Sequence, residues 1–203
     1  MNRAFKCLLS IAVPGLLLAS VPAKADTAFS LQQFDVPQSA STEADGINDA
    51  GTIVGFFVDR SGLEHGFLRQ YGAFTQLDFP GSKTTRTVGI NNFGDVVGSF
   101  TEASGAQHGL VRENGTFVRV DFPGAASTAV LAINDSGKIV GKFTDASGNT
   151  HGFLKSGGAF KQLDFPKSTG TVAFGINDKD QIVGSYNDAA GTQHAFVGCD
   201  DGL

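Results

Sequence analysis

The strongest constraint on this chain is an unbroken internal repeat of 43 residues. All four histidines fall at this spacing, at His65, His108, His151 and His194. Four further columns keep the same period: Asp35, Asp78, Asp121 and Asp164; Pro37, Pro80, Pro123 and Pro166; Thr42, Thr85, Thr128 and Thr171; and Asn48, Asn91, Asn134 and Asn177. The period runs from Leu31 to Phe196 without insertion or deletion. It predicts a fold in which each copy forms the same unit and packs on its neighbours.

Phenylalanine supplies the predicted core of each copy. The chain has 18 Phe and no Trp, and twelve of the Phe occupy repeated positions. Their columns are Phe74, Phe117 and Phe160 with Leu31; Phe79, Phe122 and Phe165 with Val36; Phe57, Phe100 and Phe143 with Tyr186; and Phe67, Phe153 and Phe196 with Leu110. A large apolar side chain at one place in every copy is expected to be buried, which stabilises the fold by roughly 1.5–3 kcal/mol each time.

Each copy contains four short strand patterns. In the second copy they span residues 85–91, 95–100, 108–111 and 117–122. Turn residues separate them, including the hairpin signal Asn114-Gly115, and Pro123-Gly124 ends the last one. No segment shows a sustained helical period. The sequence therefore predicts an all-β fold of four 43-residue repeats, each with about four antiparallel strands.

The phase of the repeats favours a closed ring. The chain opens with a strand of the fourth type, residues 29–36, and ends after one of the third type, residues 194–197. Four strands in this length match a β-propeller blade. We therefore predict a closed four-bladed β-propeller in which the N-terminal strand completes the last blade and no sheet edge stays open. A column of small residues, Gly46, Gly89, Ala132 and Gly175, suits an innermost strand. An open β-solenoid, a β-prism-like ring and two chains paired into a larger ring are the alternatives.

Residues 1–25 have the features of a secretory signal peptide. Arg3 and Lys6 precede an apolar stretch from Leu8 to Ala19, and Ala23-Lys24-Ala25 forms a cleavage site. We expect a mature chain of residues 26–203, secreted to the periplasm or the medium, with an uncleaved anchor as the alternative. This chain is a single β-repeat domain, with repeats at about 29–71, 72–114, 115–157 and 158–203.

Charge and cysteine content narrow the partners. The net charge is −5, and loss of Arg3, Lys6 and Lys24 makes it −8. Nucleic acids and anionic membranes need a cationic surface, so neither is an expected partner after cleavage. The mature chain keeps one cysteine, Cys199, which cannot form an internal disulfide. An incidental thiol is the favoured interpretation, and a link between two chains, hence a homodimer, is the alternative.

The repeat resembles a known family. Its unit reads L-D-F-P-G-x-x-x-T-x-x-x-G-I-N-D-x-G-x-I-V-G-x-F-x-D-x-x-G-x-x-H-G-F. This unit is similar to the HAF repeat of extracellular bacterial proteins, and His194-Ala195-Phe196 spells the name. The resemblance covers residues 29–197. It implies an exported β-repeat protein and supplies no catalytic residue, because no activity is assigned to the family.

The histidine column is the sharpest candidate for chemistry. Four imidazoles related by symmetry could converge on an axis and bind Zn²⁺ or Cu²⁺ through His65, His108, His151 and His194. The alternative is that each histidine hydrogen-bonds inside its own blade, for instance His65 to Asp78, thirteen residues later. We favour this structural role, because a residue present in every copy normally serves folding.

Other chemistry has weaker support. Turn Asp and Asn side chains offer oxygen ligands for Ca²⁺, but they are also ordinary turn residues. The repeated Asp before Phe-Pro or Val-Pro would lie on a ring and not as a pair in one cleft. The sequence contains no G-x-S-x-G, phosphate-binding or dinucleotide-binding motif. We therefore expect no enzyme activity and no cofactor.

Function in such a protein should lie where the copies differ. Variable charged positions include Arg60, Glu64, Arg86 and Arg112, which we predict to form a ligand face. The predicted function is a secreted, non-enzymatic module that binds an unknown protein or glycan. The alternatives are a metal-binding ring through the repeated histidines and a lyase or hydrolase built on a propeller.

Overall fold

The computed structural model describes residues 30–199, which fold into four antiparallel sheets that follow one another along the chain. The first sheet has β1 (Ser41–Ile47), β2 (Ile53–Val58), β3 (Glu64–Gln70) and β4 (Ala73–Leu77). The second has β5 (Thr84–Ile90), β6 (Val96–Thr101), β7 (Gln107–Glu113) and β8 (Thr116–Val120). The third has β9 (Ser127–Ile133), β10 (Ile139–Thr144), β11 (Thr150–Ser156) and β12 (Ala159–Leu163). The last has β13 (Gly170–Ile176), β14 (Gln181–Asn187) and β15 (Gln193–Cys199).

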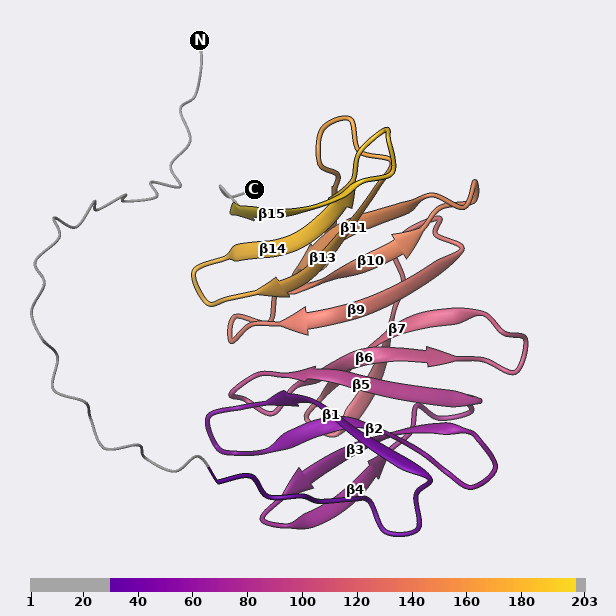
Figure 1. Ribbon diagram of the computed structural model, residues 1–203, viewed down its shortest axis with the longest axis vertical. Coiled ribbons are helices and arrows are strands. Elements are labelled where there is room, and N and C mark those ends of the chain that lie inside the picture. The colour runs from indigo at the N-terminus through magenta and orange to yellow at the C-terminus, as the bar shows by residue number, and fades with distance from the viewer. Residues whose placement is uncertain (1–29, 200–203) are drawn as a thin grey trace, which may run out of the picture.

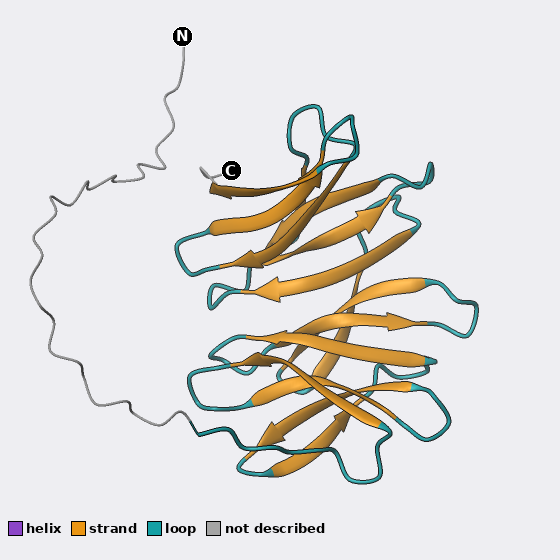
Figure 2. Cartoon of the chain, viewed as in Figure 1, coloured by secondary structure: helices purple, strands orange, loops and turns teal. Residues whose placement is uncertain are grey.

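The predicted fold class is confirmed at this level. Residues 30–199 contain strands, turns and no helix, and they form four sheets of three or four strands that recur with the 43-residue period (Figure 2). The sheets stack face to face from the first at the bottom of Figure 1 to the last at the top. The first strands of consecutive sheets, β1, β5, β9 and β13, contact one another. These contacts line the first strands up from one end of the stack to the other.

Small residues on these first strands allow the close approach. A Cβ atom added at Gly46 would lie 3.1 Å from the carbonyl oxygen of Val88 and 3.2 Å from the Cα of Gly89. A bulge interrupts the register of β1 near the same point, between Ala44 and Gly46. The absence of a side chain at Gly46 is therefore explained by backbone packing between the first and second sheets.

Turn chemistry explains where the strands end. Gly51, Gly94 and Gly137 have positive φ in the turn after the first strand, and Asp180 takes the same conformation with φ 59°. Asp tolerates this left-handed conformation better than most residues, so the fourth copy keeps the turn without glycine.

The phenylalanine columns form the core and join one sheet to the next. Phe79, in the segment that joins the first sheet to the second, stacks on Phe100 of the second sheet with ring centroids 3.8 Å apart. The same contact recurs between Phe122 and Phe143 at 3.8 Å, and between Phe165 and Tyr186 at 3.7 Å. Each pair ties a connecting segment to the sheet that follows it, which fixes how consecutive sheets pack.

A ladder of side-chain hydrogen bonds reinforces these junctions. Asn48 donates from Nδ2 to the carbonyl oxygen of Asn91 at 3.1 Å, Asn91 donates to Asn134 at 3.3 Å, and Asn134 donates to Asn177 at 3.1 Å. Each bond joins residues 43 positions apart. The repeated Asn therefore links each turn to the same turn of the next sheet.

The two ends of the stack differ from the predicted closed ring. Residues 30–36 form no strand, and they lie against the first sheet, where Phe34 and Val36 pack near Phe57 and Phe67. The last sheet keeps three strands, so the N-terminal segment does not complete it within this chain. The physical reason is that the packed junctions hold the first and last sheets at opposite ends of the stack (Figure 1). The predicted signal peptide, residues 1–25, lies outside the described residues.

Candidate functional site

The repeated histidines lie on the third strands and hydrogen-bond inside their own sheets. The Nδ1 atoms of His65, His108 and His151 lie 2.9, 3.0 and 3.0 Å from Asp78, Asp121 and Asp164 respectively. A carboxylate only accepts, so each imidazole donates. The hydrogen bond predicted at thirteen-residue spacing is confirmed. In three sheets it ties the third strand to the segment that follows the fourth strand.

A second carboxylate flanks most of these rings. His65 Nε2 lies 3.4 Å from Asp59, and His151 Nε2 lies 3.4 Å from Asp145. Burial alone would lower the pKa of His65, but the hydrogen bonds and charges of Asp78 and Asp59 outweigh it and raise that pKa above its usual value. Hydrogen bonds from Ser61, Leu63 and His65 lower the pKa of Asp59 to about 2.

The four imidazoles do not come together. Each stays in its own sheet, on β3, β7, β11 or β15, beside carboxylates of the turns and segments that border that sheet. Across residues 30–199, no group of three or more His, Cys, Asp or Glu side chains is arranged to hold a metal ion. The arrangement fits a strand-pairing role for each histidine.

Two predicted ligand-face residues do meet. Arg86, on β5, donates from Nη2 to Glu64 Oε1, on β3, at 2.7 Å. The guanidinium of Arg86 also lies 3.8 Å from the ring centroid of Phe56, which is buried. A cation held over an aromatic face and paired with a carboxylate has a fixed orientation. This cluster joins the first sheet to the second.

A cavity of about 240 Å³ opens beside this cluster. Its polar lining includes hydroxyl, amide and charged side chains, among them Thr84, Ser99, Thr101, Gln107, Arg86 and Lys142. Strands β5 to β7 of the second sheet and β9 of the third contribute most of the wall. Such a lining offers both donors and acceptors to a hydroxyl-rich ligand.

The other two predicted residues lie elsewhere. Arg60 is exposed in the turn between β2 and β3 and does not line the cavity. Arg112 lies beside the β7–β8 turn, at the opposite end of its strand from Gln107, with its guanidinium 5.9 Å from the Phe117 ring centroid. The structure therefore gathers Glu64 and Arg86 into one site and separates them from Arg112.

Sequence reasoning missed Phe56 and Lys142. They occupy one repeat position with Ser99 and Ser185. That position therefore holds an aromatic ring in one copy, a cation in another and a hydroxyl in the other two. That variability is the same signal that selected Arg86. The position was overlooked because it lies inside a strand, where variable residues suggest an exposed strand face and not a site.

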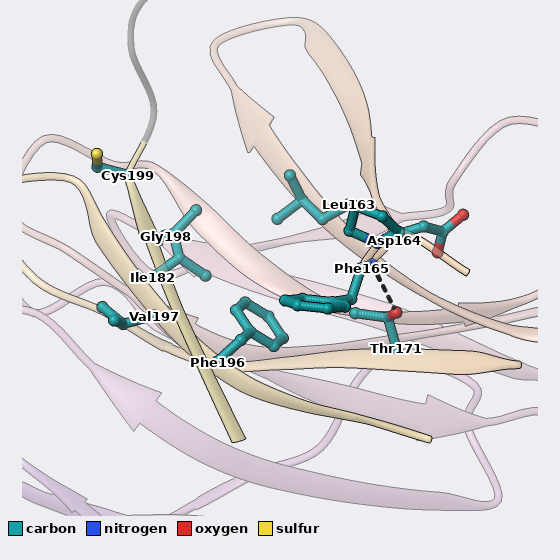
Figure 3. A pocket seen from close by; sticks show the side chains of 10 residues that line it. Leu163, Asp164, Phe165, Thr171, Ile182, Phe196, Val197, Gly198 and Cys199 are labelled. Carbon is teal, nitrogen blue, oxygen red and sulfur yellow. Dashed lines mark hydrogen bonds between the residues drawn. The ribbon is translucent and has the colours of Figure 1, made fainter. Parts of the chain in front are cut away.

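A second, mostly apolar pocket of about 200 Å³ lies along β15. Figure 3 shows Leu163, Phe165, Ile182 and Phe196 around it, with Cys199 at one end. Phe165 comes from the segment before the last sheet, whereas Phe196 belongs to β15 itself. The pocket therefore follows the outer edge of the last sheet, where the other sheets have a fourth strand.

Comparisons with known proteins add little to this geometry. No protein-family model matches the chain, and no curated protein matches it. Among solved structures, one similar chain is an arginine-to-alanine mutant of AofleA from Arthrobotrys oligospora, with 14% sequence identity and a TM-score of 0.48. The match covers 77% of this chain and 53% of the fungal one, so this chain spans about half the length of that relative.

In residues 30–199, no helix has the length and apolar character needed to cross a membrane.

Proposed function

We propose that this protein is a secreted, non-enzymatic β-repeat module that binds a glycan or a polar segment of a protein at the Glu64–Arg86 cavity. The sheets act as parts of a closed propeller-like ring, which holds the cavity rigid. The observation that carries this proposal is the placement of copy-specific residues. Arg86, Glu64 and Lys142 replace side chains of other types in the remaining copies, and all three line one polar cavity.

The chemistry of the cavity favours a hydroxyl-rich ligand. Arg86 is anchored by Glu64 and Phe56, so it presents donors without a large loss of side-chain entropy on binding. Threonine and serine hydroxyls and the Gln107 amide add weaker donors and acceptors. The HAF-like repeat and the N-terminal signal pattern support a location outside the cell, where glycans and surface proteins are the available partners.

Binding is tested with a glycan array followed by calorimetry on the purified chain. We expect retention of at least one glycan class, and Arg86→Ala to weaken it by tenfold or more. Lys179→Ala is the matched control, since it removes an exposed cation from a turn outside the cavity. If the two substitutions weaken binding equally, the ligand responds only to net charge and the proposed site is incorrect.

Export is tested separately. Expression with the native N-terminus should deliver a chain that begins at Asp26 to the periplasm or the medium, as read by mass spectrometry. An intact N-terminus on the chain inside the cell would contradict the secretion part of the proposal.

A further inference from the structure

We infer that residues 30–36 of one chain form the missing fourth strand of the β13–β14–β15 sheet in a second copy, so that two chains close one ring. This inference rests on the closed ring put forward under the proposed function, and it identifies a second copy of the chain as the molecule that closes the ring. Each chain would give its N-terminal segment and receive its partner's, forming two identical junctions.

The repeat supplies the register of this junction. Residues 30–34 stand 43 positions before β4, whose counterparts in the next two sheets are β8 and β12. In the third sheet, β12 pairs with β11 so that Leu163 faces Gly152 and Ala159 faces Ser156. Transferred by the repeat, the same register places Phe34 opposite Ala195 and Ser30 opposite Cys199.

An apolar side chain and a pocket match at the proposed junction. In the third sheet, the fourth-strand residue Phe160 packs 5.5 Å from Phe122 and 5.9 Å from Phe153, between ring centroids. The equivalent residue of the N-terminal segment, Leu31, is 88% exposed. The equivalents of Phe122 and Phe153 are Phe165 and Phe196, which line the empty pocket along β15. Leu31 of a second copy would fill that pocket.

The histidine ladder points to the same partner. His194 contacts Asp188 through Nε2 at 3.2 Å, but its sheet lacks the aspartate that follows the fourth strand in the other sheets. Asp35 occupies that position of the repeat, and it is exposed beside Gln33, which donates to it at 3.0 Å. Gln76 and Asp78 form the same pair next to His65. Asp35 and Gln33 of a second copy would therefore supply to His194 the same pair of side chains that Asp78 and Gln76 supply to His65.

The two end faces also expose what the interior junctions bury. Val54, Val97 and Val140 are 0% exposed, whereas Val183, their equivalent in the last sheet, is 50% exposed. On the other end face, Ile47 of β1 is 67% exposed, although its equivalent Ile133 is buried. Burying such residues against each other is the contact that every interior junction makes.

A second copy fits this junction better than the same chain. Closure within one chain would bring the first and last sheets together from opposite ends of the stack (Figure 1). That movement would change the angle at all three interior junctions, whose side chains are close-packed. Pairing with a second copy instead covers both end faces without changing the interior junctions.

Disulfide trapping tests which chain supplies the strand. Ser30→Cys in the full chain, with Cys7→Ser, places a thiol opposite Cys199 in the proposed register, and copper phenanthroline serves as the oxidant. We expect a covalent dimer on a non-reducing gel that reverts with dithiothreitol. The same variant with Cys199→Ser is the control and should give no such dimer. A disulfide inside one chain would overturn the second-copy inference and keep the closed ring, whereas no disulfide at all would overturn both.

Light scattering on the purified full chain gives an independent measurement. The unmodified chain should have the mass of two copies and dissociate on dilution. Val183→Asp should reduce the assembled fraction by tenfold or more, whereas Val118→Asp should not, although Val118 is 49% exposed and lies on β8, away from both end faces. A single-copy mass for the unmodified chain at every concentration would overturn the inference. Glycan binding at Arg86, measured on Val183→Asp, reports on the binding site separately from assembly.

Discussion

The interior junctions and the two ends of this molecule use the same repeat but differ in what surrounds it. Between the second and third sheets, Val97, Val130 and Phe153 are buried together. At the end of the stack, the equivalents of the first and last of these, Val183 and Phe196, border solvent or an open pocket. One sequence pattern therefore produces a core in one place and an exposed apolar face in another. The difference teaches that a repeat contributes its full stability only when both of its faces are covered.

The largest contrast is expected in the phenylalanine column of the third strand. Phe153→Ala should lower the free energy of unfolding by about 3–5 kcal/mol, because it opens a cavity in a close-packed core. Phe196→Ala should cost clearly less at protein concentrations where the chain is single, because that ring is only half buried. Urea denaturation followed by circular dichroism measures both. Equal losses would mean that the last sheet is as well covered as the third.

The asparagine ladder offers the next contrast. Asn134 is buried and bonds to the next sheet, to Ser136 and to the backbone of Lys138. Asn134→Ala should lower the free energy of unfolding by about 1–3 kcal/mol, because a buried amide loses several hydrogen bonds at once. Asn177, at the end of the ladder, is exposed, and its Nδ2 donates to Gln181 Oε1 of its own turn and not to a further sheet. Its Oδ1 still accepts from the backbone N–H groups of Lys179 and Gln181, so Asn177→Ala loses only bonds within one exposed turn and should cost less. Urea denaturation of both variants measures this difference. A larger loss of stability in Asn177→Ala than in Asn134→Ala would contradict the proposed role of the ladder.

The histidine–aspartate pairs sharpen the comparison further. A double-mutant cycle with His65→Gln and Asp78→Asn should give a coupling free energy of about 1 kcal/mol. The cycle with His194→Gln and Asp35→Asn should give no coupling in the single chain and a comparable coupling in the assembled ring. Measuring both cycles at low and high protein concentration separates the two cases. Coupling between His194 and Asp35 in dilute single chains would show that the chain closes on itself.

The smallest effect is a dependence of stability on pH. The pKa of His65 is raised in the folded state, so its contribution is complete below its unfolded value of 6.5 and is lost as pH rises through the folded value. The pKa values of Asp59 and Asp145 are lowered from 3.8 to about 2, so their contribution is present above 3.8 and is lost as pH falls toward 2.

These groups together predict the highest stability between about pH 4 and 6.5, as read from thermal unfolding across pH. His65→Gln should flatten the decline on the alkaline side. If stability declines just as steeply at alkaline pH in this variant, groups other than His65 cause the decline.

Much of the fold was predictable because each element rests on local chemistry. The glycine and asparagine turns, the alternating strands and the His65–Asp78 bond all depend on residues close together in the sequence, so spacing alone located them. The site was less predictable. Arg86 and Glu64 stand 22 residues apart and meet only because the second sheet packs on the first. Phe56 and Lys142 vary between copies as Arg86 does, but inside a strand this variability also fits an ordinary exposed strand face.

The sequence by itself determined the repeat length, the strand order within each sheet and the identity of the core columns, because these follow from short-range periodicity and burial. Only the tertiary structure decided how the sheets stack and where the stack ends. Residues 30–34 have the pattern of a strand, but a strand forms only where a partner edge lies within hydrogen-bonding distance. In this chain the matching edge, β15, lies at the other end of the stack. The sequence therefore supplied a strand pattern for residues 30–34, and the packing of the interior junctions left this segment beside the first sheet, where it forms no strand.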